Sequence, residues 1–377
     1  MSIRFFFAGD VVIMREWRDR FLGESLRAKI RACDVVCCNF EAPITGEPQV
    51  KAVKIGPSLS QNERTVQMLK EEGFSLFSFA NNHIMDYGMD GLKRTLDACC
   101  KEDVCCIGAG TSAEEAYKPF VFEKEGIRVG IVSVAENGFG TSIREDTGGY
   151  AWFGAKRIYD TLEELLGSCD HVFVICHGGA EKWNIPLPEY RELYRSWIDK
   201  GVHAVIAHHP HVPQGFEQYH GGGIYYSLGN FAFDKGQGIQ DPRTVCAQIT
   251  IEGQTLHFDS VLTEFTEHGV EECSDETFIK HMEDCNALLL EPLYSQTVNQ
   301  MVQKAFREKY RNYFGNVMNL YSGGVKQWGK TIVYRGLKGE RFSNEWLYHN
   351  LAIETHYWIC RRAMDLVINP IHEEDNQ

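Results

Sequence analysis

Five short apolar runs in this chain stop in Asp, Glu, Asn or His, the side chains that bind metal ions and transfer protons. The runs and their polar residues are FFFAGD with Asp10, VVCCNFE with Asn39 and Glu41, LFSFANNH with Asn81, Asn82 and His83, VFVICHGG with His177, and AVIAHHPH with His208, His209 and His211. Ligands of α/β sheets bind beyond the carboxyl ends of the strands. One Asp or Asn after a strand is ordinary turn chemistry, but five such clusters together predict a single functional crevice.

The donor atoms in these clusters suit a pair of divalent ions. Carboxylates and amide oxygens suit hard ions such as Mn²⁺ or Mg²⁺, and several imidazoles add a preference for Mn, Fe, Co or Zn. Two ions about 3.5–4 Å apart need roughly one bridging carboxylate and ligands from several loops. The five clusters supply enough side chains, so the sequence predicts two divalent ions, with Mn, Fe or Zn as candidates.

The segment AHHPH carries a prediction about its own geometry. Pro210 disfavours helix at His209 and pushes that residue toward an extended backbone. In an extended chain residues i and i+2 face the same side, so we expect His209 and His211 to point into one site, with His208 facing away or supporting the ligands from behind. Further along, YSLGNF places Asn230 either near the site or in a simple Gly-Asn turn.

The segment ANNHIMDYGMDGL contains candidates for proton chemistry. Asn82 offers an amide oxygen to a metal ion, and the adjacent His83 could polarise or protonate a substrate oxygen. Asp86 is spaced either to orient His83 or to cap a helix that starts near Gly88. Three other histidines have no potential metal ligands clustered beside them in the sequence, so we expect them to be ordinary core-edge or surface residues: His171, His203 and His220.

The elements that must position these residues alternate between short β-branched or aromatic runs and helical patterns. The predicted strands are residues 3–8, 35–39, 76–80, 104–107, 128–134, 171–176, 204–207, 223–227, 244–251 and 255–263. The predicted helices are residues 17–32, 61–72, 89–101, 155–166 and 189–200. This alternation predicts an α/β domain over residues 1–265. Residues 275–318 and 344–367 have long helical patterns, so we expect a helical C-terminal extension over residues 266–377.

Composition and charge narrow the choice of ligands and compartment. The net charge is −14 at pH 7, which argues against broad binding to nucleic acid or anionic membranes, because both rely on Lys and Arg. The first apolar run is short and ends at Asp10, so we expect neither a signal peptide nor a membrane anchor. The thirteen cysteines show no CxxC spacing. We therefore expect free thiols and a cytoplasmic protein.

Six motifs follow one another along the chain: AGD at residues 8–10, NFEAPIT at 39–45, FANNHIMDYGMDGLKRTL at 79–96, HGGAE at 177–181, AHHPHVPQ at 207–214 and YSLGNFAFD at 226–234. In this order they resemble the bacterial capsule-synthesis CapA family of poly-γ-glutamate biosynthesis, a branch of the calcineurin-like metallophosphatase superfamily. The resemblance covers roughly residues 1–265. It implies a four-layer α/β/β/α sandwich with a two-metal site at the strand ends.

The resemblance also implies roles for single residues. The positions that match metal ligands are Asp10, Glu41 as the bridging carboxylate, Asn82, His177, His209 and His211. His83, oriented by Asp86, matches the residue that assists the leaving group, and Asn39 then supports the ligands from behind. The chain departs from the superfamily at Val12, where a His is usual, at Asn-Phe-Glu in place of Gly-Asp, and at Gly178, where CapA-like proteins commonly carry an aromatic residue.

These residues predict a metal-dependent hydrolase that cleaves a phosphoester, or alternatively an amide-type bond, in a small or polymeric anionic substrate. The rival prediction is a non-hydrolytic binding or assembly component of a capsule- or polysaccharide-synthesis system, with Val12 marking a site without turnover. A third alternative, a nucleotide-using ligase, rests on the P-loop spacing of GVKQWGKT at residues 324–331, but no strand precedes it and no helix follows. The C-terminal aromatic residues are typical of core packing; gathered in a surface patch, they would instead predict a homodimer interface.

Overall fold

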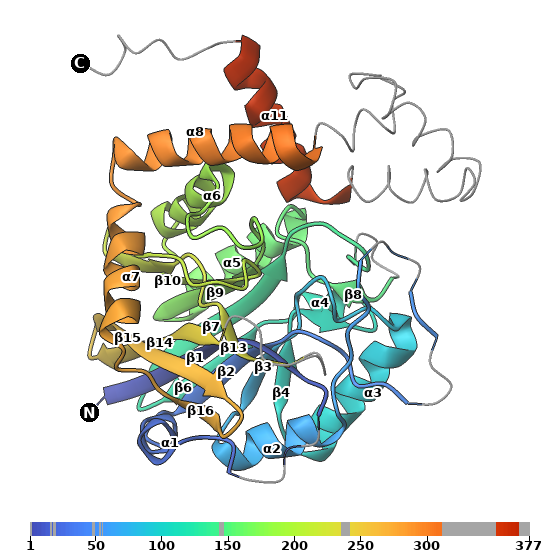
Figure 1. Ribbon diagram of the computed structural model, residues 1–377. Helices are drawn as coiled ribbons and strands as arrows, with labels where there is room; N and C mark the ends of the chain where they lie inside the picture. The colour runs from blue at the N-terminus through green and yellow to red at the C-terminus, as the bar shows by residue number, and fades with distance from the viewer. Residues whose placement is uncertain are drawn as a thin grey trace. The chain divides into compact units, whose positions relative to one another are not determined.

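The computed structural model describes two ranges, residues 2–310 and residues 352–368 (Figure 1). Within the first range, residues 16, 18, 19, 47–49, 53, 55, 143–146 and 235–241 are not described. The chain divides into two compact units. The first comprises Met1–Ala52, Ser58–Glu136 and Gly140–Leu290, and the second comprises Val53–Pro57, Asn137–Phe139 and Glu291–Gln377. The domain boundary after residue 265 stays a prediction.

The first unit contains a large sheet with the N-terminal strand near its centre. Its strand order is β16-β15-β14-β1-β2-β3-β4, and β13 pairs with the carboxyl-terminal part of β1. The strands are β1 (Ser2–Ile13), β2 (Val35–Phe40), β3 (Leu76–Ser78), β4 (Cys105–Ile107), β13 (Asn230–Asp234), β14 (Arg243–Glu252), β15 (Thr255–Thr266) and β16 (Gly269–Glu272). The strands β1 to β4 are parallel, so their carboxyl ends meet at one edge of the sheet.

A second sheet of the same unit has the order β11-β12-β10-β9-β7-β6. Its strands are β6 (Phe120–Lys124), β7 (Ile127–Ala135), β9 (His171–His177), β10 (Ala204–His208), β11 (Phe216–Tyr219) and β12 (Gly222–Tyr225). The four inner strands are parallel, and β6 and β11 run antiparallel at the two edges. A small separate sheet pairs β5 (Ala109–Gly110) with β8 (Gly149–Tyr150).

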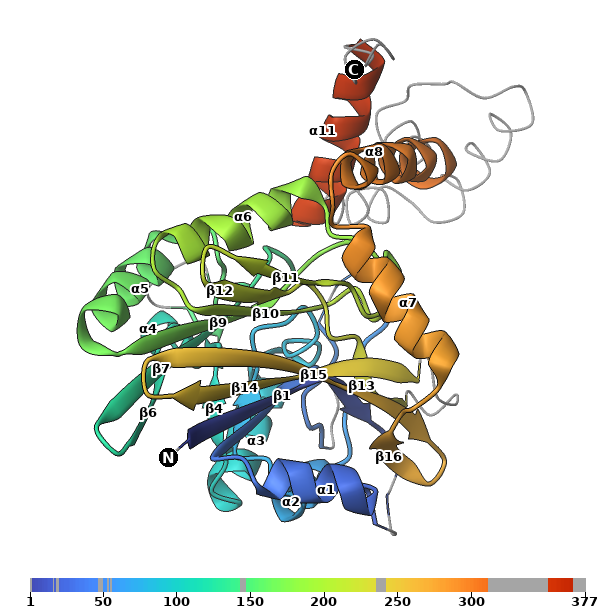
Figure 2. The same ribbon diagram turned by 90° about the vertical axis from the view of Figure 1, so that its left-hand side faces the viewer.

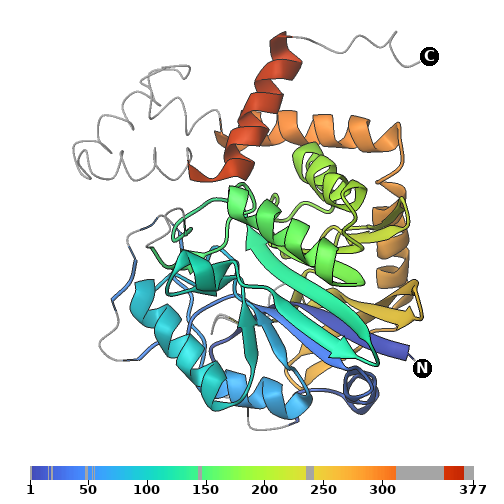
Figure 3. The same cartoon turned by 180° about the vertical axis from the view of Figure 1, so that it is seen from behind.

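The two large sheets lie face to face, with helices on both outer surfaces (Figure 2). The helices α1 (Glu24–Arg31), α2 (Arg64–Glu72) and α3 (Gly88–Lys101) lie outside the first sheet. The helices α5 (Lys156–Ser168) and α6 (Pro188–Asp199) cover the second sheet, as Figure 3 shows from behind, and the short α4 (Ala113–Ala116) follows β5. The four-layer α/β/β/α sandwich predicted from the sequence is therefore confirmed for the first unit.

Two apolar cores explain why β1 is apolar from Phe5 to Ala8. Phe5 and Phe7 belong to the core between the sheets, where the Phe5 ring packs edge-on against Phe173 at 5.3 Å. Phe6 and Ala8 point the other way, into the core beneath the helices. A strand buried on both faces needs apolar residues at every position. Buried cysteines contribute to both cores, and all thirteen are free thiols, as predicted.

Most predicted strands and helices are confirmed with ends shifted by a few residues, but the first helix is shorter than predicted. The helical pattern over residues 17–32 yields a helix only from Glu24 onward. Trp17 packs edge-on against Phe21 at 5.5 Å, and the Arg15 guanidinium lies 4.3 Å from the Trp17 ring. Two aromatic residues four positions apart imitate a helical repeat here, although they serve tertiary packing.

The predicted long helix over residues 275–318 is interrupted. The helix α7 (Glu276–Ala287) belongs to the first unit, whereas α8 (Leu293–Ala305) and the π-helical turn η1 (Phe306–Tyr310) belong to the second. Pro292 separates α7 from α8, because proline has no N–H to continue a helix. In the second unit α11 (Glu354–Ile368) follows, and the Tyr310 and His356 rings lie 5.1 Å apart.

The alternative P-loop prediction and the predicted absence of a membrane anchor concern other parts of the chain. The P-loop-like segment at residues 324–331 lies outside the described residues. Of the helices that the structure describes, none combines the length and the apolar character that crossing a bilayer requires. The homodimer and the cytoplasmic compartment stay predictions.

Candidate metal centre

The sequence-predicted ligands meet where the carboxyl ends of the parallel strands of both sheets come together. The first sheet and the loops after its strands supply Asp10, Asn39, Glu41 and Asn82, and the second supplies His177, His208, His209 and His211. All of these side chains belong to one network of polar contacts. The crevice predicted from five separate runs is therefore present as one buried cluster.

The sequence predicts that the first strand stops before Asp10, but in the structure the strand continues past it. β1 continues to Ile13, and the pairing register shifts at Asp10 against β2 and against β13. Such an irregularity re-aims a side chain. One carboxylate oxygen of Asp10, Oδ1, accepts a hydrogen bond from Asn39 Nδ2 at 2.8 Å and lies 3.1 Å from His208 Nδ1. Among the described residues no donor meets the other oxygen, Oδ2, in hydrogen-bond geometry, and His211 Nδ1 lies 3.3 Å from it.

The orientation of the Asn39 amide is set by Asn81. The backbone amides of His83 and Ile84 donate to Asn81 Oδ1 at 3.2 and 2.8 Å, which leaves the Asn81 amino group to donate to Asn39 Oδ1 at 3.1 Å. Asn39 therefore turns its own Nδ2 toward Asp10 and the neighbouring acceptors. An N–H group cannot ligate a cation, so Glu41 is the residue of the Asn-Phe-Glu motif that offers an anionic oxygen.

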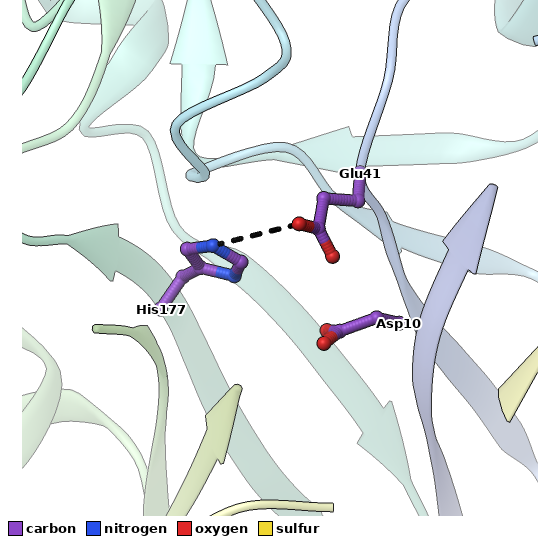
Figure 4. Close-up of side chains that lie close together, drawn as sticks. All are labelled: Asp10, Glu41 and His177. Carbon is purple, nitrogen blue, oxygen red and sulfur yellow. Dashed lines mark ion pairs between the residues drawn. The ribbon is translucent and has the colours of Figure 1, made fainter. Parts of the chain in front are cut away.

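Asp10, Glu41 and His177 form one group of candidate ligands (Figure 4). One ligand atom from each lies within 4.8 Å of the others, and the three side chains are buried. His177 Nε2 is 4.0 Å from Glu41 Oε1, the ion pair drawn in Figure 4. Two carboxylates and an imidazole in one buried group are a donor set that transition-metal ions favour.

A second set of distances also fits an ion. His177 Nε2 lies 2.9 Å from Asn82 Oδ1 and 3.0 Å from His209 Nδ1. Ligand atoms that each lie about 2.1 Å from one ion, at right angles, are about 3 Å apart. His177, Asn82 and His209 are therefore already spaced as neighbouring ligands. A half-buried amide oxygen beside an imidazole also matches the donor atoms predicted from the sequence.

The backbone around Pro210 differs from the expectation. His209 and His211 were expected to be extended, but their φ angles are +98° and +58°, in the left-handed region. Non-glycine residues in this region carry strain and cluster at functional sites. The strand β10 ends at His208, and the chain turns sharply there, with Lys182 N donating to Pro210 O at 2.8 Å. Both rings reach the cluster, through a turn and not through i, i+2 alternation.

His211 bridges the two carboxylates. Its Nδ1 lies 2.9 Å from Asn230 Oδ1, and its Nε2 lies 3.5 Å from Glu41 Oε1. Of the two alternatives for Asn230, the one that places it near the site agrees with this contact. Val12, at the position where the superfamily has a His, is fully buried in a small apolar group with Ala42 and Phe233.

The charges of the cluster depend on one another. Burial by itself raises the pKa of Asp10, but His208 and His211 beside it hold that pKa well below its usual range. Burial lowers the pKa of His211, yet the charges of Glu41 and Asp10 outweigh it and raise the pKa to about 9. Burial, together with His209, holds the pKa of His177 well below its ordinary value. The protein therefore keeps an anionic carboxylate at Asp10 and a neutral imidazole at His177, the forms that bind metal ions, whereas His211 must lose a proton to become a ligand.

His83 and Asp86 contact each other beside the cluster. His83 Nδ1 lies 2.7 Å from Asp86 Oδ2, which also accepts a hydrogen bond from Leu59 N at 2.7 Å. No side chain caps α3, so Asp86 orients His83, the first of the two alternatives. With Nδ1 turned to Asp86, the opposite nitrogen of the ring is the one that a substrate could meet.

Sequence reasoning missed one acidic residue. Glu136 follows β7 directly and is 4% exposed, and its Oε1 lies 3.5 Å from His209 Nε2. The signal was present, because SVAEN also ends a buried strand in polar residues. A single Glu-Asn pair after one strand carries no metal motif and is ordinary in a turn, so the pair does not stand out in the sequence.

The chain belongs to the family of the bacterial capsule synthesis protein PGA_cap, whose model matches residues 4–235. Two curated relatives are the PGA biosynthesis protein CapA of Bacillus subtilis (strain 168), 35% identical over 208 residues, and the capsule biosynthesis protein CapA of Bacillus anthracis, 34% identical over 214 residues. The alignments cover 55% of this chain in both cases, and 55% and 52% of the relatives. The chain thus spans about half the length of these curated relatives.

Solved structures with similar chain traces have low sequence identity. The calcineurin-like phosphoesterase YfkN from Bacillus subtilis is 12% identical, with a TM-score of 0.42 over 78% of this chain and 99% of that one. The 5′-nucleotidase from Candida albicans SC5314 is 10% identical, with a TM-score of 0.41 over 81% of this chain and 58% of that one. At these values neither structure says anything about the activity of this chain.

Proposed function

We propose that this protein is a metal-dependent hydrolase that cleaves a phosphoester bond, with up to two divalent ions of Mn, Fe or Zn as its cofactor. The observation that carries the proposal is the convergence of six potential ligands from two sheets, five of them buried and Asn82 half-buried: Asp10, Glu41, Asn82, His177, His209 and His211. A purely structural core gains nothing from such a set, because burying charges without a cation is costly.

Within this proposal each side chain has a task. His177, Asn82 and His209 would hold one ion and Asp10 and His211 would hold a second, and Glu41 lies near a histidine of each group. When bound, such ions supply a Lewis acid and lower the pKa of a coordinated water toward about 7. The second position has one imidazole fewer than the superfamily pattern, because Val12 replaces a His, so we expect it to bind its ion more weakly.

His83 is proposed to act on the leaving group. Its Nδ1 donates to Asp86 at 2.7 Å, which fixes the ring, and the carboxylate stabilises the imidazolium form, in which the nitrogen that the substrate would meet also carries a proton. Donation of that proton, or of a hydrogen bond, to the departing oxygen would stabilise the charge that develops there. The substrate is proposed to be anionic, because ions at this position supply the positive charge that the acidic chain as a whole lacks.

The direct test combines metal content with activity. Protein expressed with Mn, Fe and Zn available should carry bound metal by elemental analysis and should hydrolyse phosphomonoester or phosphodiester substrates. Glu41→Gln and His211→Ala should lose metal and activity. Glu72→Gln is a control, because Glu72 is also buried, at 4% exposure, but is paired with Arg27. A folded wild-type protein without stoichiometric metal would refute the proposal.

A second candidate function is favoured by Val12 and by the biosynthesis names of the two relatives. In this alternative the chain binds an anionic polymer as a non-hydrolytic assembly component, and the site holds metal or ligand without turnover. Binding of polyglutamate or a glycan, with no hydrolysis by the metal-loaded protein, would favour it. Metal-dependent hydrolysis that disappears in Asp10→Asn, with folding intact, would exclude it.

A further inference from the structure

Glu136 occupies a sixth strand end in the candidate metal centre. The strand β7 runs parallel to β9, with Ala135 opposite His177, so that Glu136 follows at the level of the ligands. Its backbone N–H donates to the His177 carbonyl at 2.9 Å. This contact places the Glu136 side chain on the side of His177 where His209 lies.

Each oxygen of the Glu136 carboxylate has a distinct neighbour. Oε2 accepts a hydrogen bond from the Tyr190 hydroxyl at 2.6 Å, and Oε1 lies 3.5 Å from His209 Nε2. Tyr190 is held in turn, because it is 1% exposed on α6 and its ring packs edge-on against Phe153 at 6.2 Å. The carboxylate is therefore anchored from behind and faces His209 with its other oxygen.

The two nitrogens of His209 face different groups. Nδ1 lies 3.0 Å from His177 Nε2, on the side of the candidate ligands, and Nε2 faces Glu136. A neutral imidazole carries one proton, so an acceptor at Nε2 favours the tautomer whose Nδ1 lone pair points at the ion site. The backbone of His209 is in the left-handed region and does not by itself favour this ring placement, so side-chain contacts must hold it.

We propose that Glu136, anchored by Tyr190, is the positioning residue that sets the orientation and tautomer of His209 as a metal ligand. The inference rests on the metal site of the proposed function. Ligating histidines commonly donate their second nitrogen to a carboxylate, and losing such a partner typically costs about 10–100-fold in metal affinity or activity. Glu136 faces His209 Nε2 at 3.5 Å, and the charge of Glu181 acts on the same ring.

The test measures Mn²⁺ affinity of the full chain by competition with a chelator. Glu136→Gln, which removes the charge at nearly constant shape, should weaken binding about 10-fold or more. Tyr190→Phe should weaken it less, in the same direction, and Glu136→Asp should recover part of the loss. Glu72→Gln removes an equally buried carboxylate elsewhere and should leave the Mn²⁺ affinity within about twofold of wild type.

A second readout does not depend on metal. Imidazole ¹⁵N NMR of the metal-free protein should find the His209 proton on Nε2 in the wild type and shifted toward Nδ1 in Glu136→Gln. Equal Mn²⁺ affinity and an equal tautomer in wild type and Glu136→Gln would overturn this inference while leaving the metal site standing. Should Glu136→Gln fail to fold, Tyr190→Phe provides both measurements. A wild-type chain that binds no Mn²⁺, Fe²⁺ or Zn²⁺ would overturn the proposed function and this inference together.

Discussion

His171 should make the stability of the protein depend on pH in a defined window. The residue is 1% exposed, and neither of its ring nitrogens has a hydrogen-bond partner among the described residues. Burial, with a smaller effect of the His203 charge, lowers the pKa of His171 from 6.5 to about 4. The two rings meet edge-on at 4.8 Å. Protonating His171 would therefore place a charge where the described residues form no ion pair with it, and the nearby Asp170 charge offsets only part of the cost.

The sign and the size follow from this shift. Between pH 6.5 and about 4 the unfolded chain binds a proton that the folded chain rejects, so stability falls as the pH falls through this window. With a difference of about 2.5 pKa units, the linkage amounts to about 2 kcal/mol between pH 7.5 and pH 5. Above pH 7.5 both states are neutral and the contribution no longer changes.

Urea unfolding with EDTA present, at pH 7.5 and pH 5, provides the assay, because bound ions would add their own stabilisation. His171→Leu should lose about 2 kcal/mol less than the wild type between the two pH values. Subtracting the pH-dependent loss of His171→Leu from that of the wild type removes the contribution of the other buried histidines. Parallel losses in both proteins, or an imidazole C–H resonance of His171 that titrates near pH 6.5, would refute the reasoning.

Three other outcomes are expected. Gly9→Ala should cost several kcal/mol or abolish folding, because its Cβ would lie 2.0 Å from the Gly229 carbonyl oxygen; the yield of folded protein and the urea midpoint measure this. Gly178→Ala should cost about 1–3 kcal/mol, since its Cβ would lie 2.7 Å from the Tyr190 ring, and an unchanged midpoint would contradict this close approach. Mn²⁺ at 100 times its Kd should stabilise the fold by about 2.7 kcal/mol in thermal unfolding, an effect that Glu41→Gln should lose.

The layers of the fold were predictable because they follow from local patterns. Short apolar runs such as VVCCNF and HVFVICH are buried on both faces, and buried parallel strands need such runs. The helix over residues 17–32 was misjudged because Trp17 and Phe21 repeat with a helical spacing while packing in a loop. Strand β13, inside YSLGNFAFD, pairs with β1 far away in sequence, and no local pattern reports such a partner.

The candidate site was predictable in its composition but not in its detail. The polar residues at the strand ends predict the cluster, because parallel strands bring their carboxyl ends together. The direction of the Asn39 amide could not be predicted, because it depends on Asn81, forty-two positions further along the chain. The left-handed backbone at His209 could not be predicted either, since the propensity imposed by Pro210 points to an extended chain and the tight turn after β10 overrides it.

The two large sheets share no hydrogen-bonded strand within the described ranges, and the candidate ligands are divided between them. An ion held by Glu41 and Asn82 on one side and by His177 and His209 on the other would act as a removable cross-link between two otherwise separate sheets. Its presence should then slow amide hydrogen exchange in the interior that the sheets share, around Phe5 and Phe173, far from any ligand atom. Metal binding would thus change the local stability of the whole sandwich, and not only that of the site.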